Sequence, residues 1–523
     1  MGKTHWTSDR PDSKTITDGS ARRIYNANYR NKYSNGKPGR PEMRSAPPQE
    51  DVRSARHRSA VGGSQSTGGA LPANGGPGSN GVAALASSRH SFVSPATKEG
   101  RWNLSFVGLM FYAFIEYSRL PEMYPIFQLL DLGKVAIILA AVGYLASPRA
   151  QSGVRSSSRG IDTAVLVFTI GNLLSSCFAS QQTHVWGAFL QAVYYATVYF
   201  LLTRILTSFW QIRTFLFLVL LLNLKLAQHT VRSYSMYRSS GMSDMRIIMS
   251  GGAGAGVTSF FGNAGDRGLA MTVVWGIVWA WLVGKVEKKR SVRVFLAICF
   301  VLFFFAILFC GTRGAVVGAA AIVLAALARS PKRIGAAFLA IVFLLGVWLI
   351  LPGASKQRFG AAWDWQTDPD TASRITYWGL GLEMFEHNPI LGVGPGNFVY
   401  LNPFNQVEHS VYVQVLSGLG LVGTTSFLAM LVLFFRLNAR TRKLALQTGG
   451  GRRSFAYCLA FGLDLGMVGY LTSGAFLSVL YYPHLWILLG LSVALNKCCL
   501  NEPREQQAVE EELRQRKFVS AVS

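Results

Sequence analysis

The chain has 523 residues, half of them hydrophobic, and a formal net charge of +25. Between Leu104 and Asn496 the hydrophobic residues gather into long runs, many of which approach the roughly 20 residues that an α-helix needs to cross a bilayer. This distribution excludes a soluble multidomain protein of the same length. It predicts an all-α fold, that of a polytopic membrane protein.

The first 103 residues have a different composition. They are rich in Ser, Gly, Arg and Asn, and they hold 16 lysines and arginines against 7 aspartates and glutamates. Few large apolar residues are present to offset the entropy of ordering, so we expect a disordered basic tail. No apolar core of the signal-peptide type lies near Met1. Such a tail could contact anionic lipid or nucleic acid, but a solvated cytoplasmic extension is the simpler interpretation, and we expect no nucleic-acid partner.

Twelve apolar runs follow, and each is predicted to be a transmembrane helix. In chain order they cover residues 104–118, 127–147, 161–180, 186–206, 211–228, 269–284, 292–310, 314–328, 334–351, 410–435, 455–474 and 480–496. Together they predict a transmembrane domain over residues 104–497. A short cytoplasmic C-terminal tail is predicted over residues 498–523.

The connectors between these runs alternate in charge, which predicts their orientation. Five basic connectors together hold 19 lysines and arginines: residues 148–160, the segment with Arg204 and Arg213, and residues 285–293, 329–333 and 436–453. Positive connectors mark the cytoplasmic side of a membrane protein. We therefore expect both termini in the cytoplasm, the protein in the inner (cytoplasmic) membrane, and two long loops, residues 229–268 and 352–409, on the periplasmic face.

Three ionisable residues lie where the outer loops enter apolar runs. Arg267 precedes the sixth run, Arg313 lies in the turn CGTRGAVVG, and His409 precedes the tenth run. Each arginine alone is also explained as an interfacial anchor, since its side chain can snorkel. Two arginines on one outer surface suit a pyrophosphate, which guanidinium groups bind in a bidentate manner. His409 is either an interfacial hydrogen-bonding residue or a general base, because a neutral imidazole accepts a proton at physiological pH.

No metal or cofactor is expected. The six cysteines show no C-x-x-C spacing, and no two histidines lie at the spacing of metal ligands. The glycine strings GGAGAG and GVGPG do not complete the G-x-G-x-x-G pattern of nucleotide-binding loops. GVGPG is predicted to form a chain of tight turns.

Three stretches of the sequence form a more specific pattern: GTRGAVVGAAA, RITYWGLGLEMFEHNPILGVGPGNF and EHSVYVQVLSGLGLVG. They supply a small-residue turn carrying Arg, a glycine-rich loop ending in G-N-F, and a His before a G-L-x-G helix. In this order they resemble the O-antigen ligase and polymerase superfamily of integral membrane glycosyltransferases. The resemblance covers residues 104–497.

This resemblance implies about a dozen transmembrane helices and a large late periplasmic loop. It further implies transfer of a glycan from undecaprenyl pyrophosphate to a hydroxyl of lipid A core, of another glycan or of a protein, without a nucleotide sugar or a metal. By the same resemblance His409 is the base that activates the acceptor, and Arg313 and, less distinctively, Arg267 bind the donor pyrophosphate. Arg374 matches a loop arginine of the family that contacts glycan or phosphate or serves packing. The sequence does not separate a lipopolysaccharide ligase, a polymerase and a protein O-glycosyltransferase.

Two other classes remain open. A secondary transporter or flippase for lipid-linked glycans also has about twelve spans, but this chain shows no matching halves. Few acidic residues lie within its apolar runs, Glu116 and Asp464 being exceptions. A purely structural membrane anchor would give the arginines and histidine of the outer loops no role.

Overall fold

A computed structural model describes residues 102–118, 130–146, 159–239, 264–329, 333–351, 353–361, 368–447 and 451–501. All of them belong to one of the two compact units of the chain, Val93–Ser523. The predicted N-terminal tail up to residue 101 and the predicted C-terminal tail beyond residue 501 lie outside the described residues.

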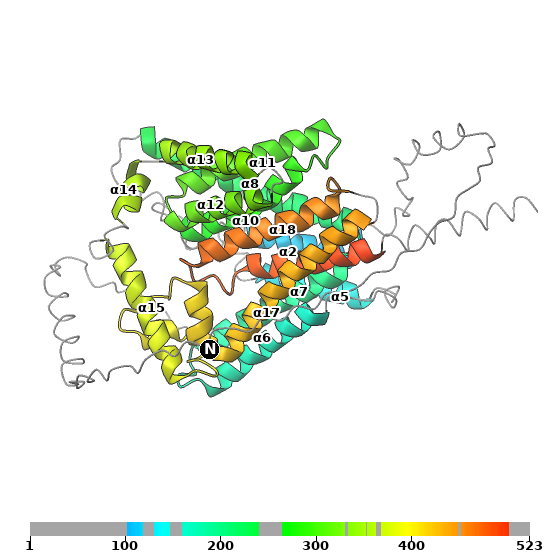
Figure 1. Cartoon of the computed structure of the whole chain (residues 1–523). Helices are drawn as coiled ribbons and strands as arrows, with labels where there is room; N and C mark the ends of the chain where they lie inside the picture. Colours follow the sequence, from blue (N-terminus) through cyan, green and yellow to red (C-terminus); the bar gives the residue numbers. More distant parts are fainter. Residues whose placement is uncertain are drawn as a thin grey trace, which may run out of the picture. The chain divides into compact units, whose positions relative to one another are not determined.

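Within the described ranges every regular element is a helix (Figure 1). The helices are α2 Leu104–Ser118, α5 Leu132–Ala146, α6 Arg159–Phe178, α7 Val185–Ile205, α8 Phe209–Ser239, α10 Ala264–Val283, α11 Arg290–Phe309, α12 Arg313–Ala328, α13 Arg333–Ile350, α14 Gly353–Ala361, α15 Pro369–His387, α16 Phe398–Leu401, α17 Val411–Gln447, α18 Phe455–Gly474 and a C-terminal helix, Pro483–Asn501. Eight are long and apolar enough to cross a membrane, and four shorter apolar helices accompany them. The predicted all-α, polytopic membrane fold is confirmed, and each of the twelve predicted runs overlaps a helix of the described residues.

Two connectors differ from the sequence prediction. α8 continues to Ser239, into the predicted loop of residues 229–268, because hydropathy marks where a chain leaves the apolar layer rather than where its helix ends. The predicted late loop, residues 352–409, contains α14, α15 and α16. α15 begins with Pro369 directly after Asp368 at the N-cap position, a favoured helix start. Polar and apolar residues alternate along α15, so its sequence does not form an apolar run.

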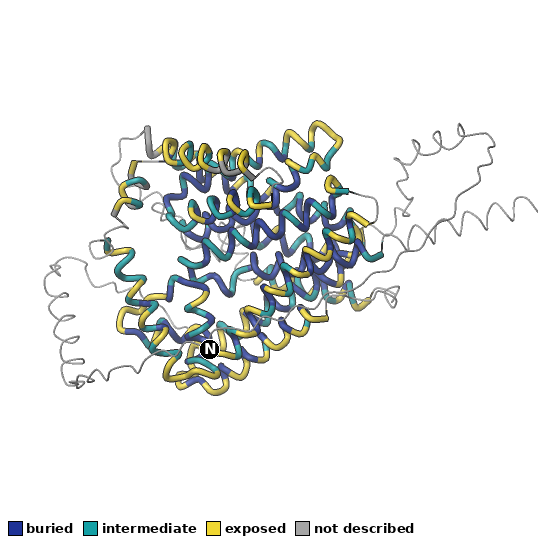
Figure 2. The backbone as a smooth tube through the Cα atoms, viewed as in Figure 1, coloured by how far each residue is buried: buried dark blue, intermediate teal, exposed yellow. Residues whose placement is uncertain are grey.

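α10, α18 and the C-terminal helix form the centre of the bundle. In their most apolar segments 78%, 72% and 94% of the residues are buried, against 33% in α11. Figure 2 shows the contrast between these buried helices and peripheral ones such as α13, on which Ile334 is 89% exposed and Leu349 76% exposed. Apolar side chains left exposed along an outer helix are what a lipid-facing surface requires.

The backbone of α17 is broken at Gly420, which has φ 59° and ψ −153°. Around this break the helix pairs with the loop that follows α15, through two hydrogen bonds in each direction. The four bonds run from Val393 N to Ser417 O (2.9 Å), from Gly394 N to Gly418 O (3.1 Å), from Leu421 N to Pro389 O (2.8 Å) and from Val422 N to Ile390 O (3.2 Å). The break therefore exchanges bonds within the helix for bonds to the loop, and it leaves these backbone groups satisfied.

Glycine is required on both sides of this pairing. Gly392 has φ +70°, and a Cβ there would fall against the backbone of Gly418. At Gly420 a Cβ would lie 2.5 Å from Ile390 O. The glycine strings GVGPG and GLGLVG thus allow two backbones to approach closely, which only residues without a Cβ permit.

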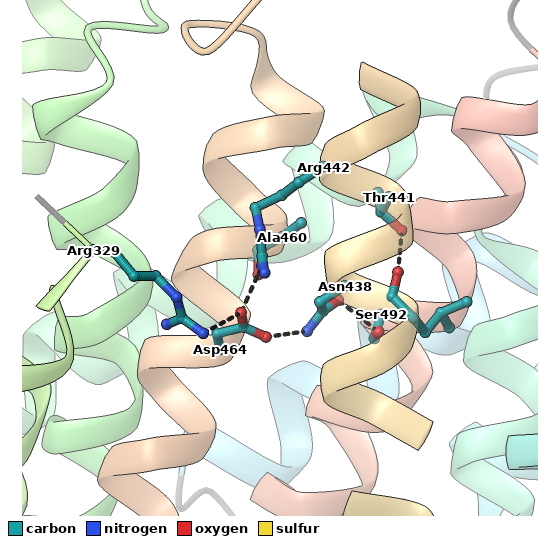
Figure 3. Close-up of polar contacts among 8 residues, drawn as sticks. Arg329, Asn438, Thr441, Arg442, Ala460, Asp464 and Ser492 are labelled. Carbon is teal, nitrogen blue, oxygen red and sulfur yellow. Dashed lines mark hydrogen bonds and ion pairs between the residues drawn. The ribbon is translucent and has the colours of Figure 1, made fainter. Parts of the chain in front are cut away.

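A buried polar cluster joins four helices at the opposite end of α17 (Figure 3). Asp464 of α18 is fully buried and pairs with Arg442 of α17 (2.5 Å) and Arg329 at the end of α12 (3.5 Å). It also accepts a hydrogen bond from Asn438 of α17 (2.9 Å), whose amide oxygen accepts one from Ser492 of the C-terminal helix (2.7 Å). Both arginines come from predicted basic connectors, so two of these connectors meet at this end of the bundle.

The backbone pairing predicts different effects for two glycines of similar conformation. Gly451 also has a positive φ (+64°), but a Cβ there would meet nothing within 4 Å. We expect Gly451→Ala to cost about 1–2 kcal/mol of backbone strain and to leave the protein folded. Gly392→Ala adds a clash with the α17 backbone, so its midpoint of thermal unfolding in detergent should fall much further. Equal shifts for the two variants would contradict the pairing.

Candidate functional site

His409 lies in the turn directly before α17. Its backbone has φ +49°, in the left-handed region where His and Asn occur more often than most other side chains. The next residue, Ser410, is buried, and its hydroxyl accepts a long hydrogen bond from Val413 N (3.5 Å) at the start of the helix. The imidazole itself is half-buried. The turn therefore holds His409 at the end of the helix.

α15 brings charged groups to His409. It packs on the first segment of α17, and Gly381 lies so close that a Cβ there would overlap an α17 side chain. The ring centroid of Tyr377 lies 6.1 Å from that of His409. Arg374 and Asp370, earlier on α15, both act electrostatically on the imidazole.

These surroundings keep His409 neutral. Burial lowers the pKa of the imidazole below its ordinary value of 6.5, the positive charge of Arg374 lowers the pKa further, and Asp370 opposes both in part. At neutral pH the ring is therefore unprotonated. It is able to accept a proton from a nearby hydroxyl.

Arg374 is held by the segment that follows α18. Its Nη1 donates a hydrogen bond to Phe476 O (2.9 Å), and its Cζ lies 6.0 Å from the centroid of the Phe476 ring. The end of α18 and this segment both contact the start of α12: Ser473 Oγ, in the last turn of α18, donates to Gly314 O (3.1 Å), and a Cβ at Gly314 would lie 3.3 Å from the Phe476 ring. Arg374 and the N-terminus of α12 therefore meet at Phe476.

Arg313 is the first residue of α12 and pairs with the residue that precedes α15. Its Nη1 lies 2.6 Å from Asp368 Oδ2, which also accepts a hydrogen bond from the Thr371 hydroxyl (2.5 Å). Burial raises the pKa of Asp368, but the hydrogen bonds from Thr371 and Arg313 and the charge of Arg313 outweigh burial and hold this pKa below 3.8. An ionised carboxylate thus orients the guanidinium of Arg313.

Arg267 lies in the first turn of α10. α10 begins against the turn before α12, because a Cβ at Gly268 would lie 2.8 Å from Cys310 Sγ and 2.9 Å from Thr312 Oγ1. Beside it, Asp266 accepts a hydrogen bond from the Tyr482 hydroxyl (3.1 Å). The start of α10 therefore lies at the same end of the bundle as the start of α12.

Glu408 directly precedes His409 and is only 4% exposed. Its Oε2 accepts a hydrogen bond from the Ser478 hydroxyl (2.9 Å), and nearby Gln414 Oε1 accepts one from Leu480 N (3.0 Å). Burial raises the pKa of the Glu408 carboxyl above 4.5, although its hydrogen bonds oppose this shift. The segment after α18 is thus bonded to the turn before α17 as well as to α15.

The chemistry available at this end of the bundle is that of cations and a proton acceptor. Among the described residues no group of three or more His, Cys, Asp or Glu side chains is placed to hold a metal ion. Guanidinium groups beside a neutral imidazole suit a reaction in which an anion is bound and a proton is removed.

One segment of the chain is similar to a known protein family. Residues 298–428 match the family described as O-antigen ligase. This segment is therefore similar to the O-antigen ligase family. The match supports the O-antigen ligase and polymerase superfamily and indicates a ligase of the membrane glycosyltransferase type in polysaccharide biosynthesis. It favours this class over a transporter or an anchor. No curated protein matches the chain.

The segment that matches the O-antigen ligase family contains most of the candidate site. It begins inside α11 and ends inside α17, beyond the Gly420 break. Arg313, Arg374 and His409 fall within it, whereas Arg267 lies outside it. The structure brings the first three together through α15 and the segment after α18.

Two acidic residues of the site, Asp368 and Glu408, were not predicted from the sequence, because only cations and histidines at the ends of apolar runs were considered as site residues. Asp368 had a local signal, since Asp-Pro is a favoured helix start. Glu408 had none, because its partner, Ser478, is 70 positions away in the chain.

Glu408 predicts a pH-dependent stability. Because its pKa in the folded protein is raised above 4.5, the folded state binds the proton more tightly, and its contribution to stability is lost as the pH rises from 4.5 through the folded pKa. We expect Glu408→Gln to raise the midpoint of thermal unfolding relative to wild type at pH 7.5, with a smaller gain at pH 5. Glu408→Ala, which leaves Ser478 without its acceptor, should be destabilised by about 1–3 kcal/mol at both values. A gain that is larger at pH 5 would contradict a raised pKa.

Proposed function

We propose that this domain transfers a glycan from an undecaprenyl-pyrophosphate carrier to an acceptor hydroxyl. The observation that carries the proposal is the neutral imidazole of His409 beside the guanidinium of Arg374, with Arg313 held at the start of the same helix, α15. The reaction needs a group that takes a proton from the acceptor and cations that stabilise the departing pyrophosphate. This arrangement supplies both.

The residues then have distinct roles in the transfer. An unprotonated ring nitrogen of His409 accepts the proton of the acceptor hydroxyl. The acceptor oxygen bonds to the anomeric carbon as the bond from that carbon to the pyrophosphate oxygen breaks, which inverts the anomeric centre. Arg313 and Arg374, with Arg267 at the start of α10, stabilise the negative charge on the lipid pyrophosphate that leaves.

The ion pair of Arg313 indicates how it would bind the donor. The Asp368 carboxylate oxygen lies 2.6 Å from Arg313 Nη1 and is negatively charged, as a phosphate oxygen bound by this guanidinium would be. A guanidinium has five N–H donors, so Arg313 can keep Asp368 and still bind a phosphate oxygen. Asp368 therefore orients the arginine that is to bind the donor.

The proposed orientation places this end of the bundle at the periplasmic face of the inner membrane. The basic connectors supply Arg329 and Arg442 to Asp464 and Arg213 to Glu287 (3.6 Å), away from the helix ends that carry the site. The positive-inside rule then assigns those connectors to the cytoplasm. His409 would face the compartment opposite to them.

Replacement of the proposed base has a matched control. Asparagine tolerates the positive φ of residue 409 but is not a base at neutral pH, so His409→Asn should fold normally. Transfer from an undecaprenyl-pyrophosphate glycan by the purified protein should fall about 100-fold or more. His387→Asn, at the exposed end of α15, should keep wild-type activity. Undiminished transfer by His409→Asn would refute the proposal.

The pH dependence of transfer tests the role of Arg374. Activity should be lost as the pH falls through the pKa of His409, which lies below 6.5 because of burial and the charge of Arg374. Arg374→Gln removes that charge, so the pKa of His409 should rise. The acidic limb of the pH profile of kcat/KM should then move to higher pH. Arg374→Lys keeps the charge and should leave the limb in place. An acidic limb that is the same in both variants would contradict the assignment.

A further inference from the structure

The loop between α15 and α17 is held rigidly by two buried asparagines. The fully buried Asn397 side chain donates hydrogen bonds to Gln181 O (3.0 Å) and Val393 O (2.8 Å). Asn402, 4% exposed, donates to Gln406 O (2.9 Å) and accepts from the backbone N–H of the residue two positions on (3.0 Å). The backbone that carries the exposed side chains of this loop is therefore anchored before and after α16.

This rigid loop exposes aromatic rings. Tyr400 stacks on His184 at the N-cap position of α7, with ring centroids 3.6 Å apart and planes 10° apart, and Tyr400 remains 47% exposed. Phe404 is 42% exposed. The amide side chains of Asn405 and Gln406 follow it and are exposed as well. Aromatic faces next to amides form a surface that is apolar and hydrogen-bonding at once.

Phe404 is connected to His409 through the ring of Tyr377. The Tyr377 ring centroid lies 5.7 Å from that of Phe404 and 6.1 Å from that of His409. Asp368, which holds Arg313, precedes Tyr377 by nine residues, which corresponds to about 14 Å along α15. The turn of α15 that carries Tyr377, next to both His409 and Phe404, therefore lies beyond the Arg313–Asp368 pair, and we assign the Phe404 side of His409 to the acceptor.

We propose that His184, Tyr400 and Phe404, with the amides of Asn405 and Gln406, bind a sugar ring of the acceptor. The acceptor hydroxyl is then that of a carbohydrate. One face of a pyranose carries mostly C–H groups and covers an aromatic ring, while its hydroxyls bond to amides. A serine or threonine of a protein acceptor offers no such face. This inference rests on the proposed function, because it assigns the acceptor of that reaction.

Exposed aromatic rings also occur where a protein meets the membrane interface, and Trp186 provides a control for that role. It is 41% exposed on the same end of α7, but it packs against Phe189, with ring centroids 5.9 Å apart. If the rings only anchored the protein in the interface, Trp186→Ala would act as Tyr400→Ala does. A sugar site predicts that the two variants differ.

Binding of a carbohydrate to the full-length protein tests this directly. The probe is the de-lipidated glycan released from the source cells by mild acid, titrated into the His409→Asn protein, in which transfer does not consume it. Adding Tyr400→Ala or Phe404→Ala should each weaken binding several-fold, and the two together by about tenfold or more. Tyr400→Phe, which keeps the ring, and Trp186→Ala should bind as the parent does. Should one alanine variant not fold, the other still decides.

Three results would overturn the inference: unchanged binding in the Tyr400 and Phe404 alanine variants, an equal loss with Trp186→Ala, or preferential binding of a serine- and threonine-containing peptide that depends on the same rings. None of these bears on whether His409→Asn abolishes transfer. Failure of the sugar site is therefore distinguishable from failure of the proposed function.

Discussion

The pairing of the 389–394 loop with the broken turn of α17 is the interaction on which the rest of the site depends. Four backbone hydrogen bonds join the two segments, and glycines at 392 and 420 allow them to approach. Because the loop is the direct continuation of α15, the pairing sets where that helix lies against α17. It thereby sets the separation between His409, at the start of α17, and the charges of α15.

Around this pairing, three segments each supply one ionisable side chain of the site. α12 begins with Arg313, α15 carries Arg374, and the turn before α17 carries His409. The segment after α18 holds them together, since Phe476 O accepts from Arg374 and Ser478 donates to Glu408. Along α15 the Arg313–Asp368 pair comes first, Arg374 next, and then Tyr377, whose ring lies next to both His409 and Phe404. This order corresponds to donor pyrophosphate, reacting hydroxyl and acceptor sugar in the transfer we propose.

Much of the helical framework was predictable from the sequence, because twelve apolar runs mark helices that lipid requires to satisfy their own backbone. α15 was not predicted, since its residues are too mixed to form an apolar run, although its Asp-Pro start was visible. The GVGPG glycines were correctly predicted as turns, but not as part of a contact between two backbones. That contact joins residues 24 to 32 positions apart, and the bond of Glu408 to Ser478 joins residues 70 apart. Neither leaves a local pattern in the sequence.

The most direct measurement is an electron cryomicroscopy map of the protein in lipid nanodiscs with undecaprenyl pyrophosphate, the leaving group of the proposed reaction. The account predicts pyrophosphate density in contact with the guanidinium groups of Arg313 and Arg374, with the His409 ring facing the same space. Density for the pyrophosphate at the Asp464 end of the bundle, or a His409 ring turned away from both arginines, would contradict it.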